Sequence, residues 1–343
     1  MKNESTTITP GFTNLTDFHK RFPDEESCRA YLELIRWKGN ITCPHCKGTP
    51  VYRIDGGKKY KCGSCGKKSS VKVGTIFEQS PLPLSKWFLA FHFVASRKKG
   101  ISSIQLANDI GVTQKTAWFM LGRLRYALRA RSFEVPLKGI VEADEAYVGG
   151  KPRKKSATPP KRGRSTEKKT PVLAVVERGG ELRSMPSADV KAATITDFLE
   201  ANVSPNAVLM TDEFSSYGKM GDIFAGHESV NHAQGQYVRC QLDGPKVHTN
   251  TIEGAFSHFK RMIYGTYHHI SREHTHRYCA EHDYRYNTRT MKSPDRFVRT
   301  LGMVEGRLTY KILIANGTRV QRINRATEEA KRREEWTAGL LPF

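Results

Sequence analysis

Residues 140–148 read Ile-Val-Glu-Ala-Asp-Glu-Ala-Tyr-Val, and this stretch decides how the second half of the chain is interpreted. Its apolar and β-forming residues predict a strand, although the strand carries three acids, Glu142, Asp144 and Glu145. Side chains alternate along a strand, so Asp144 shares a face with Glu142 and Ala146, and Glu145 lies on the opposite face. Burying a carboxylate among apolar residues is costly without a partner. Asp144 on one face, or Glu145 on the other, is therefore a candidate metal ligand.

The pattern downstream of this strand alternates between strands and helices. Apolar runs and helical periodicity predict strands over 172–177, 181–185 and 207–211, and helices over 189–201, 249–263 and 274–287. The Arg-Gly-Gly run at 178–180 is predicted to be the turn that pairs the first two of these strands. Strands followed by alternating helices and strands indicate an α/β domain.

A second acid and a helix add to the candidate site. Asp212 ends the predicted strand over 207–211, and the helix near residue 250 carries Glu253 and Lys260, seven residues apart and nearly in line. Asn250 lies about 60° away, on the same broad face. Mg²⁺ suits such a group because it prefers oxygen ligands and is usually held by one or two carboxylates with substrate phosphates. Each aspartate could instead cap a strand end, and Asn250 with Glu253 also matches a capping box.

The overall charge points to a polyanionic partner. The 343 residues include 56 Lys+Arg against 34 Asp+Glu, a formal net charge of +22. Counterions released from a phosphate backbone drive the binding of Lys and Arg, so nucleic acid is the favoured partner. No stretch approaches the roughly 20 apolar residues that a membrane span needs. The polar first ten residues lack a signal-peptide core, and we expect a cytoplasmic protein with no membrane partner.

Four of the seven cysteines form two C-x2-C pairs with fifteen residues between them: Cys43 and Cys46, then Cys62 and Cys65. This spacing is typical of a tetrahedral structural zinc site. A hairpin predicted over 51–61, with strands at 51–54 and 58–61, makes the unit a zinc ribbon. Two disulfides are the alternative, and the missing signal peptide argues against them. The other cysteines are predicted to be ordinary buried thiols: Cys28, Cys240 and Cys279.

A helix-turn-helix pattern lies between the ribbon and the strand at 140–148. Ala107 is small enough for two helices to approach, Gly111 supplies a turn, and Thr113 can cap the second helix. The outer face of that helix offers side chains suited to phosphates and base edges: Gln114, Lys115, Arg123 and Arg125. An ordinary helical hairpin is the alternative.

Residues 151–169 contain nine Lys or Arg, one Glu and a Pro-Pro pair, which predicts a mobile basic loop. Its one-sided charge favours contact with nucleic acid over a merely solvated loop. Four of its side chains are candidate DNA contacts, together with two at the end of the helix near 250: Lys154, Lys155, Arg162, Arg164, Lys260 and Arg261.

Taken together, these residues resemble the DDE-superfamily transposases of bacterial insertion sequences, in the group with an N-terminal zinc ribbon. Forty residues lie between the second aspartate and the glutamate, which suits the compact members. The resemblance spans about residues 25 to 300 and is carried by the acids and by four runs: Arg36-Trp37 before the first cysteine pair, Glu-Ala-Asp-Glu-Ala-Tyr-Val-Gly-Gly-Lys ending at Lys151, His248-Thr-Asn-Thr-Ile-Glu253, and Tyr264-Gly-Thr-Tyr-His-His-Ile-Ser271.

The resemblance implies an RNase-H-like fold, dependence on Mg²⁺ (or Mn²⁺), and cut-and-paste or related DNA transposition. It implies that Asp144 bridges two metal ions, that Asp212 holds one, and that Glu253 or Asn250 holds the other. Part of the group has asparagine in the third position. Because an amide adds no charge, we expect Glu253 to be the ligand. Lys260 is expected to bind a phosphate near the end of the element.

The sequence thus predicts a multidomain α+β protein. The domains expected are a helix with the zinc ribbon over 1–78, the helix-turn-helix over 79–135, the catalytic domain with a mixed sheet over 136–300, and a partly helical tail over 301–343. Transposon ends and target DNA are the expected partners, with a dimer or larger assembly because transposition joins two ends. Two alternatives stay open: a DNA-binding regulator derived from a transposase, and a structure-specific nuclease of the same fold.

Overall fold

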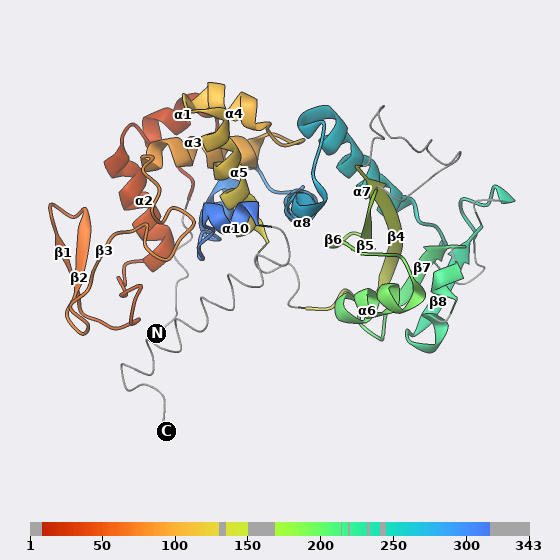
Figure 1. The fold of residues 1–343 in the computed structure, drawn as a ribbon. Coiled ribbons are helices and arrows are strands. Elements are labelled where there is room, and N and C mark those ends of the chain that lie inside the picture. Colours follow the sequence, from red (N-terminus) through yellow and green to blue (C-terminus); the bar gives the residue numbers. More distant parts are fainter. Residues whose placement is uncertain are drawn as a thin grey trace.

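The computed structural model describes residues 9–129, 135–149, 169–213, 215–218, 220–231, 234–240 and 245–315. Within these ranges, a helical part that carries a small sheet lies beside a larger sheet covered by helices (Figure 1). Two predictions lie outside the described residues: the basic loop, apart from its last residue, and a charged helix expected over 319–336. None of the helices in the described ranges has the length and apolar character to span a membrane.

The ribbon forms where the cysteine pairs predict it. Its strands β1 (Val51–Ile54), β2 (Lys59–Cys62) and β3 (Lys68–Ser69) pair antiparallel in this order. The hairpin turn requires left-handed backbone, which Gly56 and Gly57 adopt with φ of 59° and 81°. The two-residue β3 was not predicted because so short a strand has no periodic signal.

Two helices precede the ribbon, α1 (Leu15–Arg21) and α2 (Glu25–Trp37). The side chain of Asp24 caps α2 by accepting a hydrogen bond from the backbone N–H of Ser27 at 2.8 Å. One face of α2 is buried, in a core that also contains Tyr60 of the ribbon. The ribbon therefore shares its core with the helices, as a unit of this size requires.

Three helices follow the ribbon: α3 (Leu84–Ser96), α4 (Ser103–Ile110) and α5 (Gln114–Leu128). The last two helices of the described chain, α9 (Ser293–Leu301) and α10 (Tyr310–Ile314), return to them. One apolar core contains residues of α1, α2, α3, α4, α5 and α9. α9 therefore packs with the N-terminal helices, although it comes after the large sheet in the sequence.

The helix-turn-helix forms at the predicted local signals. Gly111 ends α4 with φ of 62°, and the side chain of Thr113 accepts from the backbone N–H of Thr116 at 3.2 Å to begin α5. Ala107 is buried between the helices. Apolar residues at helical spacing along α5 are also buried: Ala117, Leu121, Leu124 and Leu128.

A mixed sheet of order β6-β5-β4-β7-β8 forms the second part of the molecule. Its strands are β4 (Ile140–Val148), β5 (Thr170–Glu177), β6 (Leu182–Pro186), β7 (Val208–Asp212) and β8 (Gly226–Val230). β5 is antiparallel to β4 and β6, whereas β7 is parallel to β4 and β8. The first four strands were predicted. β8 was not, because Gly-His-Glu-Ser-Val has no apolar alternation.

Helices cover both faces of this sheet (Figure 1). α6 (Ala192–Asn202) shares a core with Val141 of β4, and α7 (Asn250–Met262) and α8 (Thr275–Asn287) share a core with Ala146. Alternate residues of β4 thus face opposite layers, as predicted, and the second part is an RNase-H-like α/β unit within an α+β chain. Shorter helical turns complete the described chain: η1 (Ser215–Tyr217), η2 (Met220–Asp222), the π-helical η4 (Ile263–Tyr267) and η5 (Arg272–His274).

A buried charge cluster joins the two parts of the molecule. Glu281 of α8 is 1% exposed and accepts hydrogen bonds from Arg125 of α5 and Arg285, each at 2.7 Å. The hydroxyl of Tyr267 donates to the same carboxylate at 2.8 Å. A Cβ at Gly100 would collide with this hydroxyl, so the close approach of the two parts requires glycine there.

Candidate functional site

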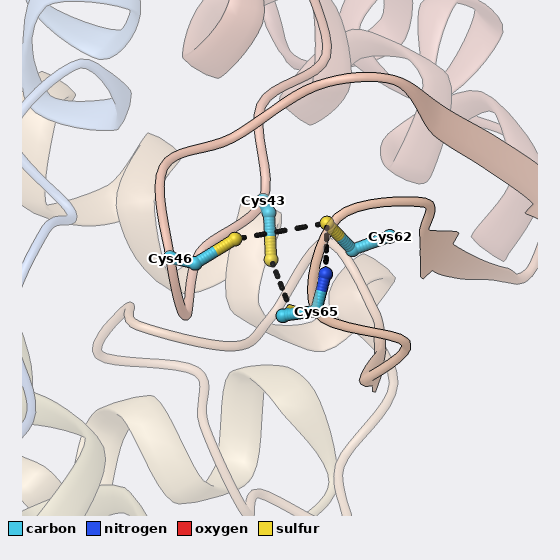
Figure 2. A group of neighbouring side chains, drawn as sticks. All are labelled: Cys43, Cys46, Cys62 and Cys65. Atoms are coloured by element: carbon cyan, nitrogen blue, oxygen red, sulfur yellow. Dashed lines mark hydrogen bonds between the residues drawn. The ribbon is translucent and has the colours of Figure 1, made fainter. Parts of the chain in front are cut away.

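The four ribbon cysteines gather their sulfur atoms in one place (Figure 2). The Sγ atoms of Cys43 and Cys65 are 3.7 Å apart, and so are those of Cys46 and Cys62. Four sulfur ligands at about 2.3 Å from a tetrahedral zinc ion lie about 3.8 Å from one another, so the group fits a structural Zn²⁺. The backbone N–H of Cys65 lies 3.5 Å from the Sγ of Cys62 and lowers the pKa of that thiol, whereas the pKa of Cys46 in the same cluster is raised.

The remaining three cysteines lie away from this cluster. Cys28 and Cys279 are buried, as predicted, and burial raises the pKa of each thiol well above its ordinary value. Cys240 is exposed, so the prediction of a buried thiol was wrong for that residue. It lies in an irregular segment before α7, where no apolar periodicity could have indicated its exposure.

Asp144 and Asp212 lie on neighbouring parallel strands. The ladder between β4 and β7 pairs Glu142 with Met210. Two residues further along each strand are Asp144 and Asp212, so the register carries both aspartates to the same end of the sheet. Both side chains are partly buried. The sequence predicted the two strands, and their pairing brings the two acids together.

The surroundings of Asp144 disfavour its charged form. Burial raises its pKa to about 8, from an ordinary value of 3.8, and the negative charges of Glu145, Asp212 and Glu253 add to this shift. The effect of Glu253 places the acid of α7 within electrostatic reach of Asp144. The three acids that the sequence singled out therefore lie in the same region of the molecule, at β4, β7 and the start of α7.

α7 presents its functional candidates on its exposed side. The helix begins at Asn250, and Thr249 precedes it and donates its hydroxyl to Oε1 of Glu253 at 3.0 Å. The capping box considered for Asn250 and Glu253 does not form, because Asn250 is the first residue of the helix and not its cap. Asn250, Glu253 and Lys260 are all exposed, as side chains that meet a substrate must be.

Tyr217 and Glu145 extend the site to the other face of β4. The hydroxyl of Tyr217 donates to Oε2 of Glu145 at 3.3 Å. Burial and the nearby charge of Asp212 raise the pKa of Glu145, while burial and the charge of Glu145 raise that of Tyr217. Tyr217 could not be singled out from the sequence, because only the turn after β7 brings it close to the acids.

The acids fit a hard divalent cation. A cation would offset the repulsion and burial that keep Asp144 protonated, and Mg²⁺ prefers such oxygen ligands. Across the described ranges, however, only the ribbon cysteines bring three or more ligand atoms within 4.8 Å of one another. A looser group of carboxylates still suits Mg²⁺, which commonly keeps several water ligands and binds one or two carboxylates.

Two of the α5 residues predicted to face DNA are buried. Arg123 is 5% exposed and donates to two backbone carbonyl oxygens at 2.7 and 3.1 Å, and Arg125 is 4% exposed within the charge cluster on α8. The prediction that these two arginines are exposed was wrong. The apolar residues of α5 indicate one buried side, but α8 and α10 pack against the helix as well and cover the side that carries the arginines. Gln114 and Lys115, at the start of α5, are exposed as predicted, and Arg261 of α7 is exposed too.

Positive charge gathers instead at the junction of the two parts. A cavity of about 530 Å³ there has four arginines in its lining: Arg125, Arg129, Arg277 and Arg307. Burial, with the charges of Arg125 and Arg129, lowers the pKa of Arg277 to about 10. Sequence analysis missed this group because its members come from segments far apart in the chain.

A zinc ribbon followed by an RNase-H-like sheet that carries aspartates at matching positions of adjacent strands is the arrangement expected of a DDE transposase with an N-terminal zinc ribbon. Residues 136–287 match the ISXO2-like transposase domain, and residues 23–68 match the transposase zinc-ribbon domain. The chain is also 32% identical over 260 residues to an uncharacterized protein in transposable element ISH50 of Halobacterium salinarum, covering 71% of this chain and 85% of that protein. The chain therefore belongs to the ISXO2-like transposase family.

Two solved structures were compared with the chain. They are a pre-cleavage Mos1 transpososome, 14% identical with a TM-score of 0.23, and the Mos1 strand transfer complex, 13% identical with a TM-score of 0.19. In each case 61% of this chain and 75% of the other chain are covered.

Proposed function

We propose that this transposase binds the terminal inverted repeats of its own insertion sequence and cuts and joins DNA by metal-dependent phosphoryl transfer. The observation that carries the proposal is the register of the parallel strands β4 and β7, which sets Asp144 beside Asp212, with Glu253 of α7 close enough to help raise the pKa of Asp144. Membership of a transposase family supports the same activity.

The residues have separate roles in this proposal. Bound Mg²⁺ (or Mn²⁺) would activate the attacking water or 3′-hydroxyl and stabilise the leaving 3′-oxygen. Asp144 and Asp212 would hold the metal from adjacent strands, and Glu253 would complete the site from α7. We favour Glu253 over Asn250 because a carboxylate adds charge and because its neighbourhood includes Asp144. Lys260, two helical turns further on, would bind a backbone phosphate.

DNA would contact several parts of the chain. The ribbon and the exposed start of α5, with Gln114 and Lys115, would bind the terminal repeats. Arg261 and the basic loop 151–169 would contact backbone phosphate, and neutralising Lys154, Lys155, Arg162 and Arg164 should flatten the salt dependence of binding. Because two ends must be joined, the active form is proposed to be a dimer or larger assembly on DNA.

A cleavage assay tests the proposal. A labelled duplex that carries one terminal repeat and its flanking DNA is incubated with the protein and Mg²⁺. We expect nicking at the end of the repeat, its loss in Asp144→Asn, and retention of repeat binding. Asp197→Asn, which removes an exposed acid of α6, is the control and should cleave normally. Cleavage by Asp144→Asn at the normal rate would contradict the assignment.

A further inference from the structure

Glu142 is fully buried on β4, two residues before Asp144 and on the same face of the strand. Its Oε2 accepts hydrogen bonds from the backbone N–H groups of Thr251 at 2.8 Å and Ile252 at 3.0 Å. Its Oε1 accepts from the hydroxyl of Thr251 at 2.9 Å. These donors lie in the first turn of α7, where backbone N–H groups have no partner within the helix. Because no side chain of the preceding residue caps α7, Glu142 serves as its cap from a distant strand.

Arg178, in the turn after β5, completes this arrangement. Its Nε donates to Oε1 of Glu142 at 2.6 Å, while Nη1 and Nη2 donate to the carbonyl oxygens of Lys246 at 2.7 Å and His248 at 2.9 Å. Both carbonyls belong to the segment that leads into α7. Glu142 and Arg178, which we call the α7 clamp, therefore hold the approach to the helix as well as its first turn.

We propose that the α7 clamp positions Glu253 relative to Asp144 and thereby sets the metal affinity of the site, an inference that rests on the proposed function. Glu142 and Asp144 are separated by a single residue of a paired strand, and Ile252 directly precedes Glu253. The clamp thus links the first acid to the third through two short, hydrogen-bonded segments. It makes Glu142 and Arg178 positioning residues, with no contact to substrate required.

The size of the effect follows from metal sites in general. Some hydrogen bonds orient a metal ligand without touching the metal themselves. Removing such a bond typically weakens metal binding roughly 10–100-fold. A loosened first turn would free the backbone at Thr251 and Ile252 to shift, so that Glu253, the next residue, would no longer be held in one position relative to Asp144. A purely structural buried ion pair would instead change stability and leave the metal affinity as it was.

Glu142→Gln in the full-length protein tests the inference. The amide keeps the shape of the side chain, but it turns one acceptor into a donor that faces Arg178 or the α7 amides. We expect Mn²⁺ affinity, measured by calorimetry without DNA, to fall roughly 10–100-fold. Hydrogen exchange at the amides of Thr251 and Ile252 should also become faster. If Glu142→Gln does not fold, Arg178→Lys should weaken Mn²⁺ binding in its place, because an ammonium cannot hold both carbonyls in a fork.

Glu281→Gln is the matched control, because Glu281 is also a buried carboxylate with arginine partners. It should destabilise the protein and leave Mn²⁺ affinity unchanged. Normal Mn²⁺ affinity in folded Glu142→Gln, or an equal loss in Glu281→Gln, would overturn the inference. If Asp144→Asn binds Mn²⁺ as tightly as the wild type, the proposed function itself is contradicted, and the role of the α7 clamp is contradicted with it.

Discussion

At the scale of single residues, the ionisation of Asp144 would link the stability of the fold to the proposed metal binding. Its folded pKa of about 8 lies above the ordinary value of 3.8, so the folded protein keeps a proton that the unfolded chain releases between these two pH values. The stabilising contribution of the protonated form is therefore complete below about pH 4 and is lost as the pH rises to about 8. A bound divalent cation removes this penalty.

Asp144→Asn should consequently be more stable than the wild type near pH 8 without Mg²⁺, and the difference should shrink toward pH 4. Added Mg²⁺ should raise the melting temperature of the wild type at pH 8 and leave the variant unchanged. Thermal unfolding in buffer freed of Mg²⁺ without a chelator measures this, because a chelator would also remove zinc from the ribbon. Equal Mg²⁺ effects on both proteins would contradict the assignment of Asp144.

The ribbon cysteines allow a second test at this scale. Purified protein should contain one zinc ion per chain, and Cys62→Ser should lose it, because the four sulfurs form one site. Loss of zinc should unfold the ribbon and weaken binding to the terminal repeats more than it slows reaction of pre-cut DNA. Cys240→Ser, at an exposed cysteine outside the cluster, should retain the metal. Metal analysis of the wild type that finds no zinc would contradict this account.

At the scale of elements, α7 separates the two candidates for the third ligand. Asn250 is the first residue of the helix and does not cap it, so Asn250→Ala should change the free energy of unfolding by no more than about 0.5 kcal/mol. Glu253→Gln keeps the shape of the side chain but removes its charge, and it should abolish cleavage while DNA binding stays intact. Normal cleavage by Glu253→Gln, with an inactive but folded Asn250→Ala, would assign the ligand to Asn250.

Helix α5 illustrates what a sequence pattern can and cannot predict. Local signals fixed its start, since Thr113 caps it and Gly111 ends the helix before it. The same pattern placed Arg123 and Arg125 on an outer face, because helical periodicity identifies one apolar side and says nothing about polar partners. Those partners include Glu281 and the carbonyl oxygen of Leu308, which lie more than 150 residues later in the chain.

At the scale of the whole molecule, the charge cluster around Glu281 connects the helical part to the sheet. Arg125→Met would leave Glu281 with one arginine fewer in a buried setting, and we expect a loss of about 3 kcal/mol in the free energy of unfolding. Lys115→Met changes an exposed residue of the same helix and should cost no more than about 0.5 kcal/mol. Denaturant unfolding of both variants measures the difference, and equal losses would contradict a role for the cluster in joining the two parts.

Asp144 and Asp212 could be singled out as candidates from the sequence because one interrupts and the other ends an apolar strand pattern, and Glu253 could be singled out by its helical spacing to Lys260. Their convergence could not be derived from those local patterns, since it depends on the register between β4 and β7 and on the packing of α7. Glu142 was recognised only as a neighbour of Asp144 on one strand face. Its contacts to Thr251 and Arg178 join three distant segments, and no local pattern contains them.

Strand transfer tests the central claim most directly. Pre-cut terminal repeats with free 3′-hydroxyls are incubated with the protein, Mg²⁺ and a supercoiled target plasmid. The account predicts covalent joining of the ends to the target, dependent on Asp144, Asp212 and Glu253 and lost without Mg²⁺. A protein that binds the repeats and joins nothing would be a regulator, and one that only nicks DNA would be a nuclease. Either result, with folded and zinc-loaded protein, would contradict the assignment as a transposase that joins DNA.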